Sequence, residues 1–354
     1  MMNKNQARLS GVHYAKSNEF KQIINIPMHI HIITPALASS LSGNRATAGR
    51  WQDFLEQSGH QVTVSVNFIH DPAKPPVDMM IALHAWRSAE AINNFRAAYP
   101  EKPLILALTG TDIYKFQISH PNVVYHSMEV ADALIGLHKH VDKGIPERFH
   151  AKLFTVLQSA TLTNQIHRES PSEKQDFIVS VIGHLREEKD SLRAATAVRE
   201  LPAFSQIKII QAGKAHNETW QSMAESECQK NTRYQWLGEI SHQEIEALMA
   251  KSKVMVISSM MEGGANVVSE ACVSGLAIIA SDISGNRGLL GDDYPAYFKA
   301  GDAQALRKLL LKAEAEPQWL ALLQSRCSVL AENFHPACEK MQLDAVVNAL
   351  LAKF

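Results

Sequence analysis

The sequence predicts two α/β domains in series, each built on a doubly wound parallel sheet. The chain has 354 residues, which favours two domains over one ordinary core. Short apolar segments alternate with amphipathic helical segments over residues 27–156, and the alternation starts again over residues 177–280. Between the two series, residues 163–175 are polar and rich in Ser, Glu and Asn. This stretch is predicted to be a linker.

The first series predicts an N-terminal domain over residues 26–165. Its strands are expected at residues 27–35, 61–68, 79–83, 104–108, 133–135 and 153–156, with helices at 45–57 and 87–98. These apolar runs suit parallel strands that are covered on both faces. Residues 1–25 are polar and lack the apolar segment of a secretion signal, so they are expected to be a frayed or disordered extension.

The second series predicts a C-terminal domain over residues 176–335. Its strands are expected at residues 177–182, 207–211, 234–236, 254–257 and 276–280. Its helices are expected at residues 191–201, 218–230, 242–250, 302–315 and 318–331. A last helix, at 336–351, begins the segment 336–354 that is expected to pack back toward the N-terminal domain. Doubly wound domains bind ligands at the carboxyl ends of their strands, so a ligand is expected in the cleft between the domains.

Composition excludes several classes of partner. The formal net charge is −1, which argues against nucleic acid and against acidic membrane surfaces. Hydrophobic residues make up 46% of the chain, yet no apolar run has the length of a membrane span. The four cysteines lack metal-like spacing and are expected to be reduced thiols in a cytoplasmic protein.

The segment SSMMEGGANVVSEA at residues 258–271 carries the strongest chemical signal. A β-branched apolar run precedes it and a helix-compatible segment follows, so it is predicted to be a strand, a tight loop and a helix start. Backbone N–H groups and the positive end of the helix would then face an anion. The carboxylates of Glu262 and Glu270 flank this position and suit the hydroxyls of a neutral polyol beside a phosphate.

The second half of the chain resembles the donor domain of GT-B glycosyltransferases of the retaining family 4. The resemblance rests on VIGHLREEK at 181–189, AG at 212–213, WLG at 236–238, the 258–271 segment, AIIASD at 277–282 and GN at 285–286. It implies two doubly wound Rossmann-like domains facing across a cleft, a UDP-sugar as substrate, and no metal or other cofactor.

The resemblance also implies roles for individual residues. Lys189 would hold the diphosphate, and Glu270 would accept hydrogen bonds from the ribose hydroxyls. The usual arginine of the Gly-Arg-Leu pattern is His184 here, so either His184 or Arg186 faces the phosphates; Arg186 is favoured because it keeps its charge at neutral pH. The sugar hydroxyls would be held by Glu262 together with the N–H groups of Gly263, Gly264 and Ala265.

The first half resembles the selenosugar synthases of selenoneine biosynthesis. The matching segments are TPA at 34–36, SGNRAT at 42–47, RW at 50–51, ALHAWRSA at 82–89 and LTGTDIY at 108–114, with GLLGDDYP at 288–295 in the second half. The resemblance implies that selenophosphate is joined to the anomeric carbon of UDP-N-acetylglucosamine or UDP-glucose with release of UDP. It also implies a functional link to a selenophosphate synthetase and a selenoneine synthase.

Residues 109–111 and 43–45 also indicate what kind of acceptor the site binds. Many members of the wider family carry His-Gly-Thr where this chain has Thr109, Gly110 and Thr111. An acceptor that arrives as a strong anionic nucleophile needs no strong general base. It needs a cationic pocket instead, and residues 43–45 (Gly-Asn-Arg) lie at a predicted helix start that would bind a phosphate-like group. The absence of a basic amphipathic helix argues against stable membrane association.

These considerations select a set of candidate site residues. The candidate catalytic residues are His84, Arg186, Lys189 and Glu262. The candidate UDP-sugar-binding residues are Gly43, His184, Arg186, Lys189, Glu262, Gly263, Gly264, Ala265, Asn266 and Glu270. The candidate acceptor-binding residues are Asn44, Arg45, Arg87, Thr109, Gly110 and Thr111. Purely structural alternatives remain for three of these features: a hydrogen-bonded histidine at 84, a helix-face cation at 87, and turn or N-cap chemistry at 109–112.

Other features favour packing over chemistry. Trp51, Trp86 and Cys272 are expected to be packing residues. The isoleucines around His29 and His31 indicate a buried sheet there, and the pair His138 and His140 lacks a third ligand in a recognisable spacing. Three alternatives to a selenosugar synthase remain. They are a conventional retaining glycosyltransferase acting on a sugar or lipid hydroxyl, a UDP-sugar epimerase, and a non-catalytic nucleotide-sugar-binding protein.

Overall fold

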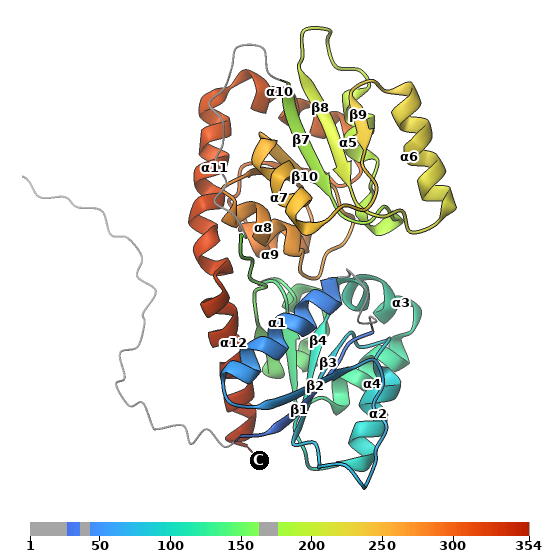
Figure 1. The fold of residues 1–354 in the computed structure, drawn as a ribbon, viewed down its shortest axis with the longest axis vertical. Coiled ribbons are helices and arrows are strands. Elements are labelled where there is room, and N and C mark those ends of the chain that lie inside the picture. The colour runs from blue at the N-terminus through green and yellow to red at the C-terminus, as the bar shows by residue number, and fades with distance from the viewer. Residues whose placement is uncertain (1–26, 36–42, 163–175, 354) are drawn as a thin grey trace, which may run out of the picture.

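The computed structural model describes residues 27–35, 43–162 and 176–353. The expected N-terminal extension and the expected linker therefore lie outside the described residues. Two parallel six-stranded sheets form the described chain, as the alternation of strands and helices predicts. Figure 1 shows the two sheets in separate layers of the molecule, one above the other, with helices around each.

The N-terminal sheet has the order β2-β1-β3-β4-β5-β6, and all its neighbouring strands pair in parallel. Its strands are β1 (His29–Ile33), β2 (Gln61–Ser65), β3 (Met79–Leu83), β4 (Leu104–Leu108), β5 (Ala133–Gly136) and β6 (Leu153–Thr155). Its longer helices are α1 (Gly43–Gln57), α2 (Ala89–Ala98) and α4 (Pro121–Val130). Every residue of β3, β4 and β5 is buried, because helices cover both faces of the sheet.

The C-terminal sheet has the order β12-β11-β10-β7-β8-β9. Its strands are β7 (Phe177–Ile182), β8 (Ile207–Ala212), β9 (Tyr234–Trp236), β10 (Val254–Ile257), β11 (Ala277–Ser281) and β12 (Tyr297–Phe298). Its helices are α5 (Arg193–Val198), α6 (Glu218–Lys230), α7 (His242–Lys251), α8 (Asn266–Val273), α9 (Ser284–Leu290), α10 (Ala303–Ala315) and α11 (Pro317–Ala331). The same strand–helix alternation thus builds a second doubly wound sheet.

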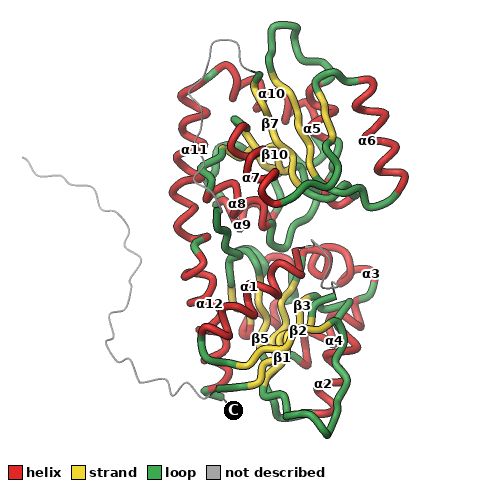
Figure 2. Tube along the Cα trace, viewed as in Figure 1, coloured by secondary structure: helices red, strands yellow, loops and turns green. Residues whose placement is uncertain are grey.

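The last helix, α12 (Pro336–Leu351), lies beside α1 at the N-terminal sheet. In Figure 2, α11 and α12 follow one another along the same edge of both layers. The fully buried carboxylate of Glu339 fixes α12 there, because it accepts hydrogen bonds from Trp51 Nε1 at 2.8 Å and from the backbone N of Ser159 at 2.7 Å. Arg50 Nε approaches the same carboxylate at 3.1 Å. This helix therefore braces the segment that leaves β6.

Several predicted boundaries were wrong for local reasons. The strand expected at 61–68 ends at Ser65, whose Oγ donates to the carbonyl of Asn67 at 2.6 Å and turns the chain. The helix expected at 191–201 is shorter, because Asp190 adopts a left-handed conformation (φ 45°) and α5 begins only at Arg193. Helices α4 and α9 and strand β12 were not predicted. A five-residue π-helix, η1 (Asp112–Phe116), was also not predicted and follows β4.

Candidate active site between the two domains

One cavity of about 820 Å³ lies between the two sheets and is lined by residues of both halves of the chain. All the candidate site residues selected from the sequence line it. From the N-terminal half these are Gly43, Asn44, Arg45, His84, Arg87, Thr109, Gly110 and Thr111, and from the C-terminal half His184, Arg186, Lys189, Glu262, Gly263, Gly264, Ala265, Asn266 and Glu270. The structure therefore brings the predicted donor and acceptor residues into one site.

The loop between β10 and α8 forms the C-terminal wall, as the strand–loop–helix prediction requires. Its Glu262 carboxylate is buried, pairs closely with the Lys189 ammonium, and accepts a hydrogen bond from Ser259 Oγ at 2.5 Å. Ser258 Oγ donates to the carbonyl of Lys189 at 3.1 Å, which ties this loop to the turn that carries the lysine. A cation and a carboxylate therefore stand side by side at the N-terminus of α8.

Glu270 lies one helical turn farther along α8 and is half-buried at the cavity wall. Burial raises the pKa of its carboxyl group, and His242 and Arg50 only partly oppose this shift. A desolvated carboxylate gains most from a ligand that supplies hydrogen-bond donors, because each donor favours the charged form. A vicinal diol supplies two such donors.

His184 and Arg186 differ in the charge they bring to the cavity. Burial lowers the pKa of His184, and the neighbouring Arg186 cation lowers it further. His184 is therefore neutral at pH 7, whereas an arginine keeps its charge in proteins. Arg186 Nε is buried and has no hydrogen-bond partner among the described residues. The charge assignment favours Arg186 as the phosphate ligand.

The N-terminal wall contributes the start of α1 and the ends of β3 and β4. Helix α1 begins at Gly43, and its first-turn residues Gly43, Asn44 and Arg45 line the cavity. Arg50, one turn farther along, donates to Asn266 Oδ1 at 3.0 Å. The first turns of α1 and α8, one from each half of the chain, thus meet at the same cavity.

His84 follows β3 and has an unusual backbone, with φ at 80°. Its Nδ1 lies 2.7 Å from Asp112 Oδ1, and its Nε2 lies 3.1 Å from Thr111 Oγ1. A left-handed conformation in a non-glycine residue costs about 1–3 kcal/mol and persists where the surroundings enforce it. Here these two contacts, a hydrogen bond from the backbone N of Arg87 to Nδ1 at 3.2 Å and a buried position hold the ring.

Asp112 was not selected from the sequence, yet it anchors this histidine. It is fully buried, and its carboxylate accepts hydrogen bonds from the backbone N atoms of Ala85, Trp86 and Thr109 at 3.0–3.1 Å. Burial alone raises the pKa of Asp112, but the hydrogen bonds from His84 and the backbone outweigh it and lower the pKa below the usual value. The signal for Asp112 was its place directly after Thr109-Gly110-Thr111, a segment for which the sequence left both substrate contact and turn or N-cap chemistry open.

Other lining residues were also missed. They include Gln158, Gly213, Lys214, Glu239 and His242. Gln158 lies just after β6, and its Oε1 is buried without a hydrogen-bond partner among the described residues. Gly213 comes directly after β8 and has φ at 144°; a Cβ there would lie 2.0 Å from the carbonyl oxygen of Gly183. A position shortly after a strand could have identified such residues, because the residues that follow parallel strands lie at one edge of the sheet.

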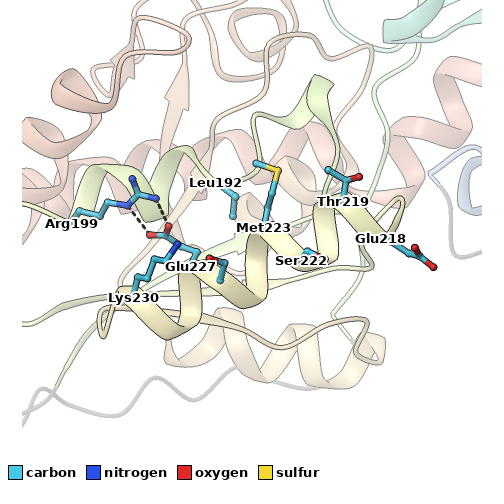
Figure 3. A pocket seen from close by; sticks show the side chains of 9 residues that line it. Leu192, Arg199, Glu218, Thr219, Ser222, Met223, Glu227 and Lys230 are labelled. Carbon is cyan, nitrogen blue, oxygen red and sulfur yellow. Dashed lines mark hydrogen bonds and ion pairs between the residues drawn. The ribbon is translucent and has the colours of Figure 1, made fainter.

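A second hollow of about 670 Å³ lies between α5 and α6, away from the candidate residues. Figure 3 shows Arg199 and Lys230 close to the Glu227 carboxylate, with Met223 and Thr219 farther along α6. Arg199 pairs with Glu227, so the strongest charges in this hollow neutralise each other.

Three residues, Trp51, Trp86 and Cys272, were expected to be packing residues. Trp51 is fully buried in the core beneath α1 and α12, and Cys272 is fully buried in the C-terminal core. Trp86 stacks on Phe116 with ring centroids 4.3 Å apart.

Among the described residues, no cluster of three or more His, Cys, Asp or Glu side chains is placed to hold a metal ion. None of the described helices combines the length and the apolar character needed to cross a membrane.

Two parallel α/β sheets facing each other across a ligand-sized cavity define the GT-B fold, and solved structures share it. A sucrose-phosphate synthase from Thermosynechococcus elongatus aligns over 92% of this chain and 100% of its own, with a TM-score of 0.76 and 14% identity. HepE from Anabaena, in complex with UDP and glucose, aligns over 91% and 100%, with a TM-score of 0.70 and 16% identity. A glycosyltransferase from Rickettsia africae aligns over 91% and 99%, with a TM-score of 0.69 and 13% identity.

The family comparison concerns the C-terminal half. Residues 163–331 match the model of the family described as glycosyl transferases group 1. The matched region contains Lys189, Glu262 and Glu270. A search of curated proteins gave no match.

Proposed function

We propose that this protein is a glycosyltransferase that takes its sugar from a UDP-sugar, in the C-terminal half of the cavity. The observation that carries the proposal is the convergence of Lys189, Arg186 and the start of α8 on one wall, with Glu270 one turn away. Cations and helix-end N–H groups stabilise a leaving diphosphate without a metal ion. The Glu270 carboxylate suits the ribose diol. The structural neighbour HepE was solved in complex with UDP-glucose, which agrees with this class of donor.

In the donor site, Lys189 and Glu262 bind different parts of the UDP-sugar. When the diphosphate binds, Lys189 exchanges its carboxylate partner for phosphate oxygens. Glu262 is then released to accept hydrogen bonds from sugar hydroxyls, together with the N–H groups of Gly263, Gly264 and Ala265. Both charges remain compensated throughout, so neither is left buried without a partner.

The acceptor that we propose is selenophosphate, and the product is a selenosugar of the selenoneine pathway. A selenium lone pair forms the bond to C1 of the sugar, most simply of UDP-N-acetylglucosamine, while the C1–O bond breaks and UDP leaves with its electron pair. Selenophosphate is already anionic, which agrees with Thr109 in place of the family histidine. The first turn of α1, Arg45 and Arg87 provide the cationic surroundings that its phosphoryl group needs. A selenophosphate synthetase would supply this substrate, and a selenoneine synthase would consume the product.

An acceptor panel tests this proposal. The protein is incubated with UDP-N-acetylglucosamine or UDP-glucose and with selenophosphate, thiophosphate, phosphate or simple sugars, and UDP release is measured. We expect release with selenophosphate. We also expect Arg45→Ala to raise the KM for selenophosphate at least tenfold, and Arg148→Ala, an exposed arginine outside the cavity lining, to leave it unchanged. UDP release with a sugar hydroxyl but not with selenophosphate would contradict the proposal.

A second candidate is conventional transfer to a sugar hydroxyl, and one observation favours it. The His84 ring, held by Asp112, presents Nε2 toward a hydroxyl at the cavity wall, and this geometry also suits deprotonation of an acceptor alcohol. The acceptor panel separates the two candidates. UDP-sugar consumption without any acceptor would instead favour an epimerase, and binding without turnover a nucleotide-sugar-binding protein.

A further inference from the structure

Thr111, His84 and Asp112 form a continuous hydrogen-bonded array at the N-terminal wall of the cavity. The carboxylate lies at the buried end, the imidazole in the middle and the hydroxyl at the cavity end. His84 Nδ1 is 2.7 Å from Asp112 Oδ1, and Thr111 Oγ1 is 3.1 Å from His84 Nε2. This is the order of groups in which a carboxylate orients a histidine and the histidine accepts a proton from a hydroxyl.

The direction of the hydrogen bonds follows from the Asp112 environment. Its carboxylate accepts from the backbone N atoms of Ala85, Trp86 and Thr109 and from Thr109 Oγ1, so it has only donors around it and remains ionised. His84 Nδ1 lies 3.2 Å from the backbone N of Arg87, which points an N–H toward it, and 2.7 Å from Asp112 Oδ1. The shorter contact with the ionised carboxylate decides the tautomer, so Nδ1 carries its proton toward Asp112. In the neutral ring Nε2 is then the acceptor, and Thr111 is its donor.

The array has no task in the carbon–selenium bond-forming step. Selenophosphate attacks as an anion, so no proton needs to be removed from the nucleophile. A second step does need a base, because the first product still carries its phosphoryl group on selenium. Cleavage of that phosphorus–selenium bond by water releases a proton.

We propose that the Thr111–His84–Asp112 array is a hydrolytic site that cleaves the phosphorus–selenium bond of the newly formed glycosyl selenophosphate. Water attacks phosphorus, the P–Se bond breaks, and selenium leaves with the electron pair. The water proton passes to Thr111 Oγ1 as the hydroxyl proton of Thr111 passes to His84 Nε2. The imidazolium then returns its Nε2 proton to Thr111 Oγ1 as the Thr111 hydroxyl proton passes to selenium. The products are inorganic phosphate and the free selenol of the sugar, so atoms and charges balance with water as the co-reactant.

Burial and charge fit this step. His84 is 1% exposed and lies behind Thr111, so the hydroxyl is the part of the array within reach of water in the cavity. Asp112 is a positioning residue, since it acts only through the histidine. Arg45 and Arg87 line the same cavity and are placed to hold the phosphoryl oxygens while the bond breaks.

The test measures inorganic phosphate and UDP together at early reaction times, and it rests on the proposed function because it uses UDP-N-acetylglucosamine and selenophosphate. The unaltered protein should release the two in equal amounts. For Thr111→Val and Asp112→Asn we expect the phosphate-to-UDP ratio to fall at least tenfold, with the selenium-phosphorylated sugar accumulating in the mass spectrum. Thr111→Ser restores the hydroxyl and should restore the ratio. Asp53→Asn, at an exposed position on α1, should leave it at one.

The outcomes separate the two proposals. If the unaltered protein releases no UDP with selenophosphate, the proposed function fails and this step fails with it. If UDP is released and Thr111→Val keeps the ratio at one, only the hydrolytic role is overturned. Should Asp112→Asn fail to fold, the Thr111→Val and Thr111→Ser pair still decides, because at this half-buried position Val replaces the hydroxyl by a methyl group of similar size and Ser keeps the hydroxyl while losing only a methyl group.

A spectroscopic measurement tests the array without any substrate. In the ¹⁵N spectrum of the histidine side chains, His84 should show a protonated Nδ1 and an unprotonated Nε2. Asp112→Asn should alter this tautomer, since an amide can donate to Nδ1. A protonated Nε2 in the neutral ring of the unaltered protein would overturn the proposed proton path.

Discussion

Gly110 of the N-terminal half and Gly263 of the C-terminal half lie back to back at the cavity. A Cβ added to Gly263 would lie 2.0 Å from the backbone N of Gly110, and one added to Gly110 would lie 2.5 Å from the backbone N of Gly263. Real Cβ atoms do not approach backbone so closely, so only glycine at both positions permits this contact. This contact places the Thr109–Thr111 loop of the N-terminal half against the Glu262–Ala265 loop of the C-terminal half, and both loops line the cavity.

The first prediction concerns this contact. Gly263→Ala keeps the backbone N–H but forces the two loops apart, so we expect turnover to fall at least tenfold with little loss of secondary structure. Gly49→Ala is the control, because nothing lies within 4 Å of the added Cβ in α1. It should keep full activity and gain up to about 1 kcal/mol of stability, since alanine is the better helix former. Full activity in Gly263→Ala would show that the close contact is dispensable.

The second prediction concerns the donor nucleoside. Glu270→Ala removes the carboxylate that we expect to accept both ribose hydrogen bonds. UDP affinity, measured by titration calorimetry, should fall by a factor of about 10–100, as expected for loss of charged hydrogen bonds of about 1.5–3 kcal/mol in all. Glu187→Ala removes an exposed carboxylate near the same wall and should bind UDP normally. Unchanged affinity in Glu270→Ala would refute the ribose assignment.

The third prediction concerns the brace between α12 and α1. Glu339→Ala leaves Trp51 Nε1, Arg50 and the Ser159 backbone N without their shared acceptor. Removing one partner of a buried ion pair costs about 3–5 kcal/mol, and denaturant unfolding should show a loss of this size. The exposed Glu332→Ala on the adjoining turn should change stability by less than about 0.5 kcal/mol. A small effect of Glu339→Ala would mean that the brace contributes little.

The fourth prediction concerns the acid stability of the interface between the two halves. Burial lowers the pKa of His138 to about 4, and its Nδ1 accepts a hydrogen bond from the backbone N of His140 at 3.1 Å. The folded state therefore binds fewer protons than the unfolded state between pH 6.5 and 4. Its stabilisation is complete above about pH 6.5 and is lost as the pH falls toward 4, by up to about 3 kcal/mol.

Denaturant unfolding at pH 7 and pH 5 measures this loss. His138→Gln should lose less stability than the unaltered protein between the two pH values, whereas the exposed His126→Gln should behave like the unaltered protein. Some acid sensitivity remains in both variants, because burial also lowers the pKa of His31 to about 4. An identical pH dependence in His138→Gln would contradict the assignment.

The strands of both sheets other than β12 could be predicted, because their own sequences carry the apolar pattern of a strand. Segments such as β3 and β4 are continuous apolar runs, which parallel strands need when helices cover both faces. Helix α9 could not be predicted, because its short sequence contains two glycines, which disfavour a helix. These glycines serve long-range packing that sequence patterns do not contain: a Cβ on Gly285 would lie 2.4 Å from the carbonyl oxygen of Glu262, and one on Gly288 2.5 Å from His138 Nδ1.

The candidate site could be predicted as far as its residues follow strand ends. Lys189, Glu262 and the 109–111 loop all lie after strands, and the parallel topology brings them to one cavity. The pairing of His84 with Asp112 could not be predicted, because β3 and β4 are neighbours only in the folded sheet. The same holds for the ion pair between Lys189 and Glu262, which follow β7 and β10, neighbours only in the folded sheet.

The most direct test of the central claim follows the bond that the proposed reaction forms. UDP-N-acetylglucosamine labelled with ¹³C at the anomeric carbon is incubated with the protein and selenophosphate, and the product is examined by NMR. We expect a one-bond coupling between ⁷⁷Se and the labelled carbon, together with release of UDP. Release of UDP with the labelled carbon bonded to oxygen would contradict it.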